Sequence, residues 1–246
     1  MIYLISTPQR CGSTWLLRML CRMAGSRDAY VDGLEMGFSL ARPRKGDAVE
    51  KLVRRLRYSA GVRVFKTHDV PSADFDAVCG AMLELRILTM QRDFRDTVVS
   101  RYFYLRYYWL TDPGLGPLPP EFGKFLAEIG ELPDHEALEA LLETGIVQGW
   151  AREWRAFEGP FTTPNALRVS YAGMLDGSEF PRLAEFTGLP MRRRKAFAAE
   201  QQQETLETGR AGKARFNRRG LVGEWREWWT EEQGAWLASL IGGPES

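Results

Sequence analysis

Residues 5–17 decide the fold of this chain; they are Ile5-Ser6-Thr7-Pro8-Gln9-Arg10-Cys11-Gly12-Ser13-Thr14-Trp15-Leu16-Leu17. This segment follows a short apolar run, residues 1–5, that predicts a buried strand. It leads into residues 14–23, where the apolar period lengthens to that of a helix. Pro8 lies in the connecting turn, and Gly12 lets the backbone approach a ligand closely. A strand is therefore expected to feed a helix through a tight loop.

The polar groups of this loop favour an anion. Backbone N–H groups at a helix N-terminus, the hydroxyls of Ser13 and Thr14 and the guanidinium of Arg10 together suit phosphate or sulfate. Taken alone, the segment fits equally well an ordinary capped turn with a surface arginine. The rest of the chain decides between these two interpretations.

The same strand-then-helix order returns twice. Residues 62–65 predict a second strand, followed by a helix over 71–82, and residues 85–90 predict a third, followed by a helix over 93–108. This order is typical of an α/β fold with a parallel sheet flanked by helices. Ligands of such sheets bind beyond the carboxyl ends of the strands, so the Arg10 loop is expected to lie near whatever follows the other two strands.

The remaining expected elements carry no chemistry of their own. Helices are predicted over 121–129, 134–157, 179–187 and 230–241, and a fourth strand over 166–170. A segment rich in proline and glycine, residues 110–120, predicts an irregular connector or a lid. Aromatic residues at helical spacing within 134–157 are expected to pack in the core.

Composition limits the classes of function. The chain has 246 residues, and we expect one domain over 1–246. A formal net charge of +1 gives no overall field for nucleic acid. Three cysteines without metal-ligand spacing predict no metal site and no disulfide framework. No signal peptide or membrane span is expected, so we predict a cytoplasmic protein.

Candidate catalytic residues follow the second strand. His68 comes directly after it, with Lys66 two residues earlier, and its ordinary pKa near neutrality suits a general base for a hydroxyl. After the third strand, Arg92 and Ser100 share a strand-helix junction where both can reach one phosphate. Each of these residues by itself is also compatible with a purely structural role.

A second basic loop lies near the end of the sequence. Arg218 and Arg219 precede Gly220, and two such loops suit a ligand with phosphates at two separated places better than a triphosphate. The usual triphosphate motif is absent, because its lysine and its upstream glycine are missing around Gly12. No apolar strand ends in an aspartate suited to hold Mg²⁺.

Four segments, in the order of a known family, resemble the cytosolic-type sulfotransferases, which move a sulfuryl group from 3′-phosphoadenosine-5′-phosphosulfate (PAPS) to an acceptor. They are the 5′-phosphosulfate loop Thr7-Pro8-Gln9-Arg10-Cys11-Gly12-Ser13-Thr14-Trp15, the catalytic-histidine segment Lys66-Thr67-His68, the 3′-phosphate motif Arg92-Asp93-Phe94-Arg95-Asp96-Thr97-Val98-Val99-Ser100 and the C-terminal loop Arg218-Arg219-Gly220-Leu221-Val222-Gly223-Glu224-Trp225. The resemblance implies a P-loop NTPase-like sulfotransferase fold with PAPS as donor, PAP as product and no metal.

The resemblance also implies a role for each matching residue. The 5′-phosphosulfate would be held by Arg10, Cys11, Gly12, Ser13 and Thr14, and the adenine contacted by Trp15 and Tyr171. The 3′-phosphate would be held by Arg92, Ser100, Arg218, Arg219 and Gly220. His68 would take the acceptor proton, with Lys66 and Arg10 neutralising charge on the transferring group.

The sequence departs from the family where the first loop carries Arg10 in place of lysine. Arginine keeps the charge but is not a point donor. This departure leaves open a catalytically inactive nucleotide-binding module. An ATP-dependent nucleotide or small-molecule kinase of similar topology is the other alternative, although the missing lysine counts against it.

The acceptor is expected to be a small molecule with a hydroxyl. Aromatic residues near the 110–120 segment favour an apolar or aromatic alcohol, although aromatic residues at helical spacing more often pack in the core. The family's C-terminal dimer motif has no match, so the sequence predicts no oligomeric state.

Overall fold

The computed structural model describes residues 1–23, 63–67, 85–108, 117–158, 165–189 and 220–242. These residues form two compact units. The first comprises Met1–Arg92 and Ala156–Ala198, and the second comprises Asp93–Arg155 and Ala199–Ser246. Each unit is described by itself, and the prediction that 1–246 form one domain stays a prediction.

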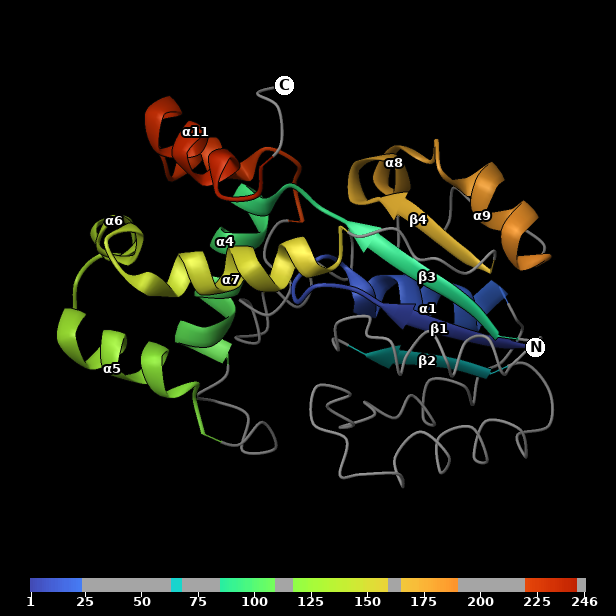
Figure 1. Ribbon diagram of the computed structural model, residues 1–246, viewed down its shortest axis with the longest axis horizontal. Helices are drawn as coiled ribbons and strands as arrows, with labels where there is room; N and C mark the ends of the chain where they lie inside the picture. Colours follow the sequence, from blue (N-terminus) through green and yellow to red (C-terminus); the bar gives the residue numbers. More distant parts are fainter. Residues whose placement is uncertain (24–62, 68–84, 109–116, 159–164, 190–219, 243–246) are drawn as a thin grey trace. The chain divides into compact units, whose positions relative to one another are not determined.

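The first unit contains a parallel sheet of four strands (Figure 1). They are β1 (Ile2–Ser6), β2 (Arg63–Thr67), β3 (Leu85–Gln91) and β4 (Ala166–Ser170), in the spatial order β2-β1-β3-β4. All pairs are parallel, with Ser6 opposite Thr67 and Gln91 opposite Ser170. The carboxyl ends of the strands therefore lie at one edge of the sheet. The connection after β1 leads to β2 on one side, and the connection after β3 leads to β4 on the other side. The point between β1 and β3 is therefore the switch point, where ligands of such sheets bind.

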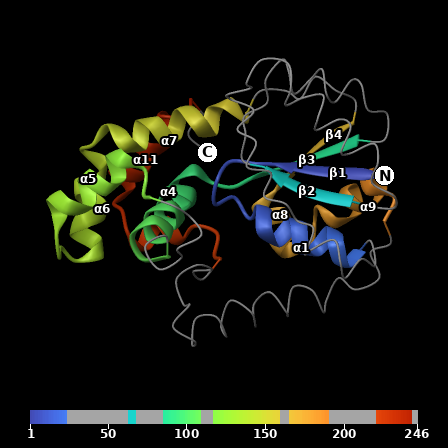
Figure 2. The ribbon, with the colours of Figure 1, turned by 90° about the horizontal axis from the view of Figure 1, so that it is seen from below.

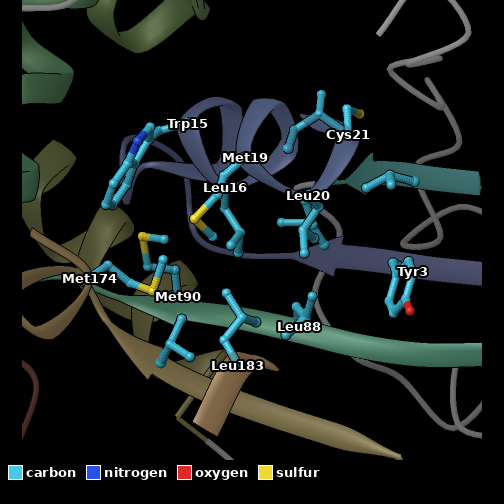
Figure 3. Packing of buried hydrophobic residues seen from close by; sticks show 14 of the residues in the cluster. Tyr3, Trp15, Leu16, Met19, Leu20, Cys21, Leu88, Met90, Met174 and Leu183 are labelled. Carbon is cyan, nitrogen blue, oxygen red and sulfur yellow. The ribbon is translucent and has the colours of Figure 1, made fainter. Parts of the chain in front are cut away.

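The sheet is covered on one face by helices α1 (Ser13–Met23), α8 (Tyr171–Asp176) and α9 (Phe180–Thr187) (Figure 2). Leu16 and Leu20 of α1 are fully buried against Leu88 and Met90 of β3 in one hydrophobic cluster (Figure 3). Their spacing of four residues places them on one side of the helix. This packing fixes the start of α1, and with it the loop that follows β1.

The second unit is helical. Its elements are α4 (Phe94–Phe103), the π-helix η2 (Tyr104–Tyr108), α5 (Pro120–Ile129), α6 (Asp134–Leu142), α7 (Gly145–Ala156), the 3₁₀ helix η5 (Glu224–Glu227) and α11 (Glu231–Ser239). Aromatic rings join them: Phe94 meets Trp154 edge-on at 6.1 Å, and Phe122 stacks on Trp150 at 6.0 Å between ring centroids. The aromatic residues expected in the core of 134–157 are therefore core residues.

The α/β class with a parallel sheet flanked by helices is confirmed, but two expected helices differ, and α8 and η5 were not expected. The single helix expected over 134–157 is wrong, because α6 ends at Leu142 and α7 begins at Gly145. Thr144 causes this break: its hydroxyl donates to the carbonyl of Leu141 at 2.7 Å and accepts from the N–H of Ile146 at 3.3 Å. A side chain that bonds the backbone in this way competes with the helical hydrogen bonds.

The remaining differences concern short helical segments. The helix expected over 93–108 changes to π-helix at Tyr104. Sequence analysis also missed α8, which begins directly after β4, where the Ser170 hydroxyl caps it by accepting from the N–H of Gly173 at 3.0 Å. The helix expected over 71–82 and most of the connector over 110–120 lie outside the described residues.

Two observations apply to the described ranges alone. No helix in them is long and apolar enough to cross a membrane. In the same part of the chain, no group of three or more His, Cys, Asp or Glu residues is placed to hold a metal ion.

Candidate functional site

The loop between β1 and α1 has an unusual backbone. Arg10 has φ +67°, the only positive φ of a non-glycine residue in the described part of the chain, and Gly12 has φ +94°. The carbonyl of Gly12 accepts the first helical hydrogen bond of α1, from the N–H of Leu16 at 3.0 Å. Two left-handed residues thus turn the chain from the strand into the helix within a few positions.

The charge of this loop is wholly positive. Residues 7–15 contain Arg10 and no Asp or Glu, and no acidic residue stands in the first turn of α1. The partial positive charge of a helix N-terminus adds to that of the guanidinium. The local field therefore favours an anion.

Gly12 lies in a cradle that admits no side chain. A Cβ on this residue would be 2.9 Å from the sulfur of Met90 and 2.9 Å from ring carbons of Tyr171. Met90 lies near the carboxyl end of β3, and Tyr171 directly follows β4 as the first residue of α8, so the tertiary structure, and not the loop alone, demands glycine here. Figure 3 shows Met90 near Trp15, on the side of β3 that faces α1.

Arg92 connects the loop to Tyr171. Its side chain is only 8% exposed, its guanidinium lies over the Tyr171 ring at 4.8 Å from the centroid, and one of its N–H groups donates to the carbonyl of Arg10 at 3.3 Å. Tyr171 also meets the ring of Trp15 edge-on at 6.0 Å. Residues far apart in the sequence therefore form one interlocked cluster beyond the ends of β1, β3 and β4.

In the second unit, two aspartates at the start of α4 accept hydrogen bonds from backbone N–H groups. Asp93 caps the helix by accepting from the N–H of Arg95 at 2.8 Å, and its carboxylate also binds the Arg95 guanidinium at 2.7 Å. This side-chain hydrogen bond raises the pKa of Arg95. Asp96, one turn before the buried Ser100, accepts from the backbone N–H groups of Gly223 at 2.8 Å and Trp225 at 2.9 Å.

The predicted site residues fall into three groups. The first unit brings together Arg10, Gly12, Trp15, Arg92 and Tyr171, with Cys11 and Ser13 buried and Thr14 half-buried in the same loop. The second unit contains Ser100 and Gly220, the latter with φ +62°. Lys66 is placed only by its backbone in β2, directly before the strand end at Thr67, and His68, Arg218 and Arg219 lie outside the described residues.

Sequence analysis missed two residues of this arrangement. Met90 packs against Gly12, where its sulfur would be 2.9 Å from an added Cβ. No motif predicts this contact, because any bulky apolar residue near the end of β3 would give the same sequence pattern. Asp96 lies within the 3′-phosphate motif over 92–100, and its spacing of four residues from Ser100 was the available signal for a shared helix face.

Comparisons with known proteins agree with this geometry. The sequence matches the family model of the sulfotransferase domain over residues 3–241, and the chain therefore belongs to the sulfotransferase family. Its fold is the P-loop-like fold of that family. No match is found among proteins of curated function.

Solved structures of similar fold include a mouse sulfotransferase, SULT7A1, complexed with PAP. It is 16% identical, the match covers 97% of this chain and 82% of that chain, and the TM-score is 0.58. Two structures of retinol dehydratase also match at 16% identity and a TM-score of 0.49, one with androsterone and inactive cofactor PAP and one with retinol and PAP. Both matches cover 98% of this chain, and they cover 79% and 80% of the respective chains.

Proposed function

We propose that this sulfotransferase transfers a sulfonate group from PAPS to a hydroxyl of a small-molecule acceptor. The observation that carries the proposal is the cluster of Arg10, Gly12, Arg92 and Tyr171 beyond the strand ends, where a glycine-only cradle and two arginines meet the N-terminus of α1. The mouse sulfotransferase of similar fold is complexed with PAP, which supports the same donor here.

The loop from Arg10 to Thr14 holds the 5′-phosphosulfate in this proposal. The loop suits an anion because residues 7–15 contain Arg10 and no carboxylate, and because the N-terminus of α1 adds partial positive charge. Arg10 extends from a left-handed backbone whose carbonyl is bound by Arg92, so its position is tied to the sheet. A cation that is already held in place stabilises a developing negative charge more than a cation that must first reorganise.

The proposed contacts to the rest of the nucleotide follow the sequence motifs. Trp15 and Tyr171 contact the adenine, and the 3′-phosphate is held by Arg92, Ser100, Arg218, Arg219 and Gly220. The position of Arg92 supports its place in this set. Its buried guanidinium lies over the ring of Tyr171, so a phosphate held by Arg92 would lie next to the residue proposed to contact the adenine.

The transfer itself is proposed to be in line and without a metal. His68 takes the proton of the acceptor hydroxyl as the new sulfur–oxygen bond forms, and the sulfur–oxygen bond to the 5′-phosphate breaks, leaving PAP. Lys66 and Arg10 neutralise the charge that develops on the transferring group and on the leaving phosphate.

The acceptor and the compartment are proposed from composition and burial. Tyr102 and Phe103 are buried in the core, so the proposal of an apolar or aromatic alcohol rests on Tyr104 and Tyr107, which are half-buried. Three cysteines without framework spacing favour the cytoplasm. An ATP-dependent kinase and an inactive nucleotide-binding module are the competing functions.

Thermal unfolding with ligands tests the donor. PAP at a hundred times its dissociation constant is expected to add about 2.7 kcal/mol to the free energy of unfolding, which raises the melting temperature by several degrees. The effect should be unchanged by EDTA, because the proposed contacts are arginines, hydroxyls and backbone N–H groups.

ATP with Mg²⁺ is the comparison ligand. A rise with ATP and Mg²⁺ but not with PAP would favour the kinase and overturn the donor proposal. Binding of PAP without any sulfonate transfer to a broad panel of alcohols and phenols would instead favour the inactive binding module.

Replacement of His68 tests the general base. His68→Ala is expected to lower turnover by at least ~100-fold, the low end for loss of a general base, while PAP binding survives. The matched control is His135→Ala, which removes the only other histidine from an exposed position in α6. Near-normal turnover of His68→Ala, or an equal loss in both variants, would remove His68 from the proposed mechanism.

A further inference from the structure

Asp96 is a buried carboxylate without a place in the proposed chemistry. Its side chain is 1% exposed, in the first turn of α4. A buried charge is costly unless hydrogen bonds compensate it. Here the N–H of Gly223 donates to one carboxylate oxygen at 2.8 Å, and the N–H of Trp225 donates to the other at 2.9 Å. Both donors lie about 130 positions further along the chain.

These two bonds cap a helix that cannot cap itself. The N-cap of η5 is Gly223, which has no side chain, and η5 has no side-chain cap of its own. Asp96 supplies the missing acceptor from another element, in the way that an Asp at the N-cap position would. The contact is therefore specific to a carboxylate, because both oxygens accept at once.

Neighbouring contacts lock the same segment in place. The guanidinium of Arg95 lies over the ring of Trp225 at 4.2 Å, and that ring is 1% exposed. On α11, a Cβ added at Gly234 would be 2.4 Å from the Trp225 ring, so the helix packs directly against the indole and leaves no space for a side chain there. Gly223 has φ +78°, a left-handed conformation that fixes the direction in which the chain enters η5.

The clamped segment adjoins the residues given to the 3′-phosphate. Gly220 stands three residues before Gly223, and Arg218 and Arg219 directly precede it in the sequence. Ser100 lies one turn beyond Asp96 on α4 and is also buried. The carboxylate of Asp96 thus holds the segment that follows Gly220 on α4, the helix that also contains Ser100.

We propose that Asp96 is a positioning residue for recognition of the 3′-phosphate, which rests on the proposed function. By holding Gly223 and Trp225 on α4, it fixes the chain end from which the basic loop extends. It touches no ligand itself, and its loss removes no phosphate contact but releases the backbone of Gly223 and Trp225 from α4.

The test compares PAP with adenosine 5′-monophosphate, which lacks the 3′-phosphate. Asp96→Asn keeps the size of the side chain, but its amide nitrogen cannot accept from an N–H group. It is expected to weaken PAP binding by about tenfold or more, the size of a lost charge-assisted contact, and binding of the monophosphate by less than about twofold. The matched control is Asp134→Asn, because Asp134 is a carboxylate of the same unit that accepts from the hydroxyls of Tyr102 and Tyr107 and not from Gly223 or Trp225.

A double-mutant cycle separates positioning from general destabilisation. In a background of Arg218→Ala with Arg219→Ala, Asp96→Asn is expected to change PAP affinity by less than about twofold, because the groups it positions are gone. Additive losses would overturn the inference, since a merely structural role predicts them.

If Asp96→Asn does not fold, amide hydrogen exchange of the wild-type protein tests the inference instead. PAP should protect residues 223–225 more than the monophosphate does, and equal protection overturns the inference.

The failure of each proposal has a distinct signature. Wild-type protein that binds PAP no more tightly than the monophosphate overturns the proposed function and the role of Asp96 with it. A preference for PAP that survives in Asp96→Asn overturns the positioning role alone.

Discussion

At the scale of single residues, backbone conformation and close contact decide the site more than side-chain identity does. Arg10 adopts a left-handed backbone that L side chains rarely take, at a cost of about 1–3 kcal/mol. The hydrogen bond from Arg92 to the Arg10 carbonyl, at 3.3 Å, helps to offset that cost. The cation of the loop is therefore held in place from a neighbouring strand.

Gly12 is the residue at which a substitution is most sharply constrained. Gly12→Ala combines a φ of +94° with a Cβ only 2.9 Å from Met90 and Tyr171, so it strains the backbone and overpacks the cradle. We expect a loss of about 1–3 kcal/mol in the free energy of unfolding and weaker PAP binding. Chemical denaturation and a PAP titration of the same variant measure the two effects.

Gly145→Ala is the matched control for this substitution. No heavy atom lies within 4 Å of a Cβ added at Gly145, and its φ is not in the left-handed region. Alanine there should leave PAP binding unchanged and the free energy of unfolding equal or slightly higher, because it restricts the unfolded chain. Similar losses in both variants would contradict the cradle around Gly12.

At the scale of elements, α1 shows how burial changes the chemistry of a side chain. Cys21 of α1 is 3% exposed and belongs to the hydrophobic cluster of the first unit, and this burial raises the pKa of its thiol from 9.0 to about 11. The unfolded chain loses this proton near its ordinary pKa, whereas the folded chain keeps it to higher pH. Between pH 9 and about 11 the folded state therefore binds more protons, and stability falls as pH rises.

Replacement of this thiol gives a prediction for the pH dependence of unfolding. Cys21→Ala is expected to remove a slope of up to about 1.4 kcal/mol per pH unit in this window. Urea denaturation of both proteins at pH 8 and at pH 10.5 measures it, and the other titrating groups, including the buried Tyr3, are common to the two. The same fall in stability for both proteins would contradict the raised pKa of Cys21.

Elements also show where sequence patterns stop being informative. The strand expected over 166–170 is β4, and helix α1 begins one residue before the expected position, because apolar period and helix caps are local properties. The break at Thr144 is decided by a side chain that bonds the backbone on both sides. The π-helix at Tyr104–Tyr108 has no sequence signature that we recognise.

At the scale of the whole molecule, the order β2-β1-β3-β4 assembles the site of the first unit. The loop over 7–15, Arg92 and Tyr171 are separated by tens of residues in the sequence, yet each follows a strand of the same parallel sheet. In the second unit, the bonds from Asp96 to Gly223 and Trp225 join segments that are separated still further. The family model spans both units, from residue 3 to residue 241.

The sequence by itself determined the α/β class, predicted an anion-binding first loop and contained the four segments that resemble the sulfotransferases. These features depend on local patterns, namely apolar period, glycine position and charge, which short stretches of chain carry in full. Only the tertiary structure decided that Gly12 rests on Met90 and Tyr171, that Arg92 holds the Arg10 carbonyl and that Asp96 caps η5. Such contacts depend on strand register and helix packing, which bring together residues that no local pattern connects.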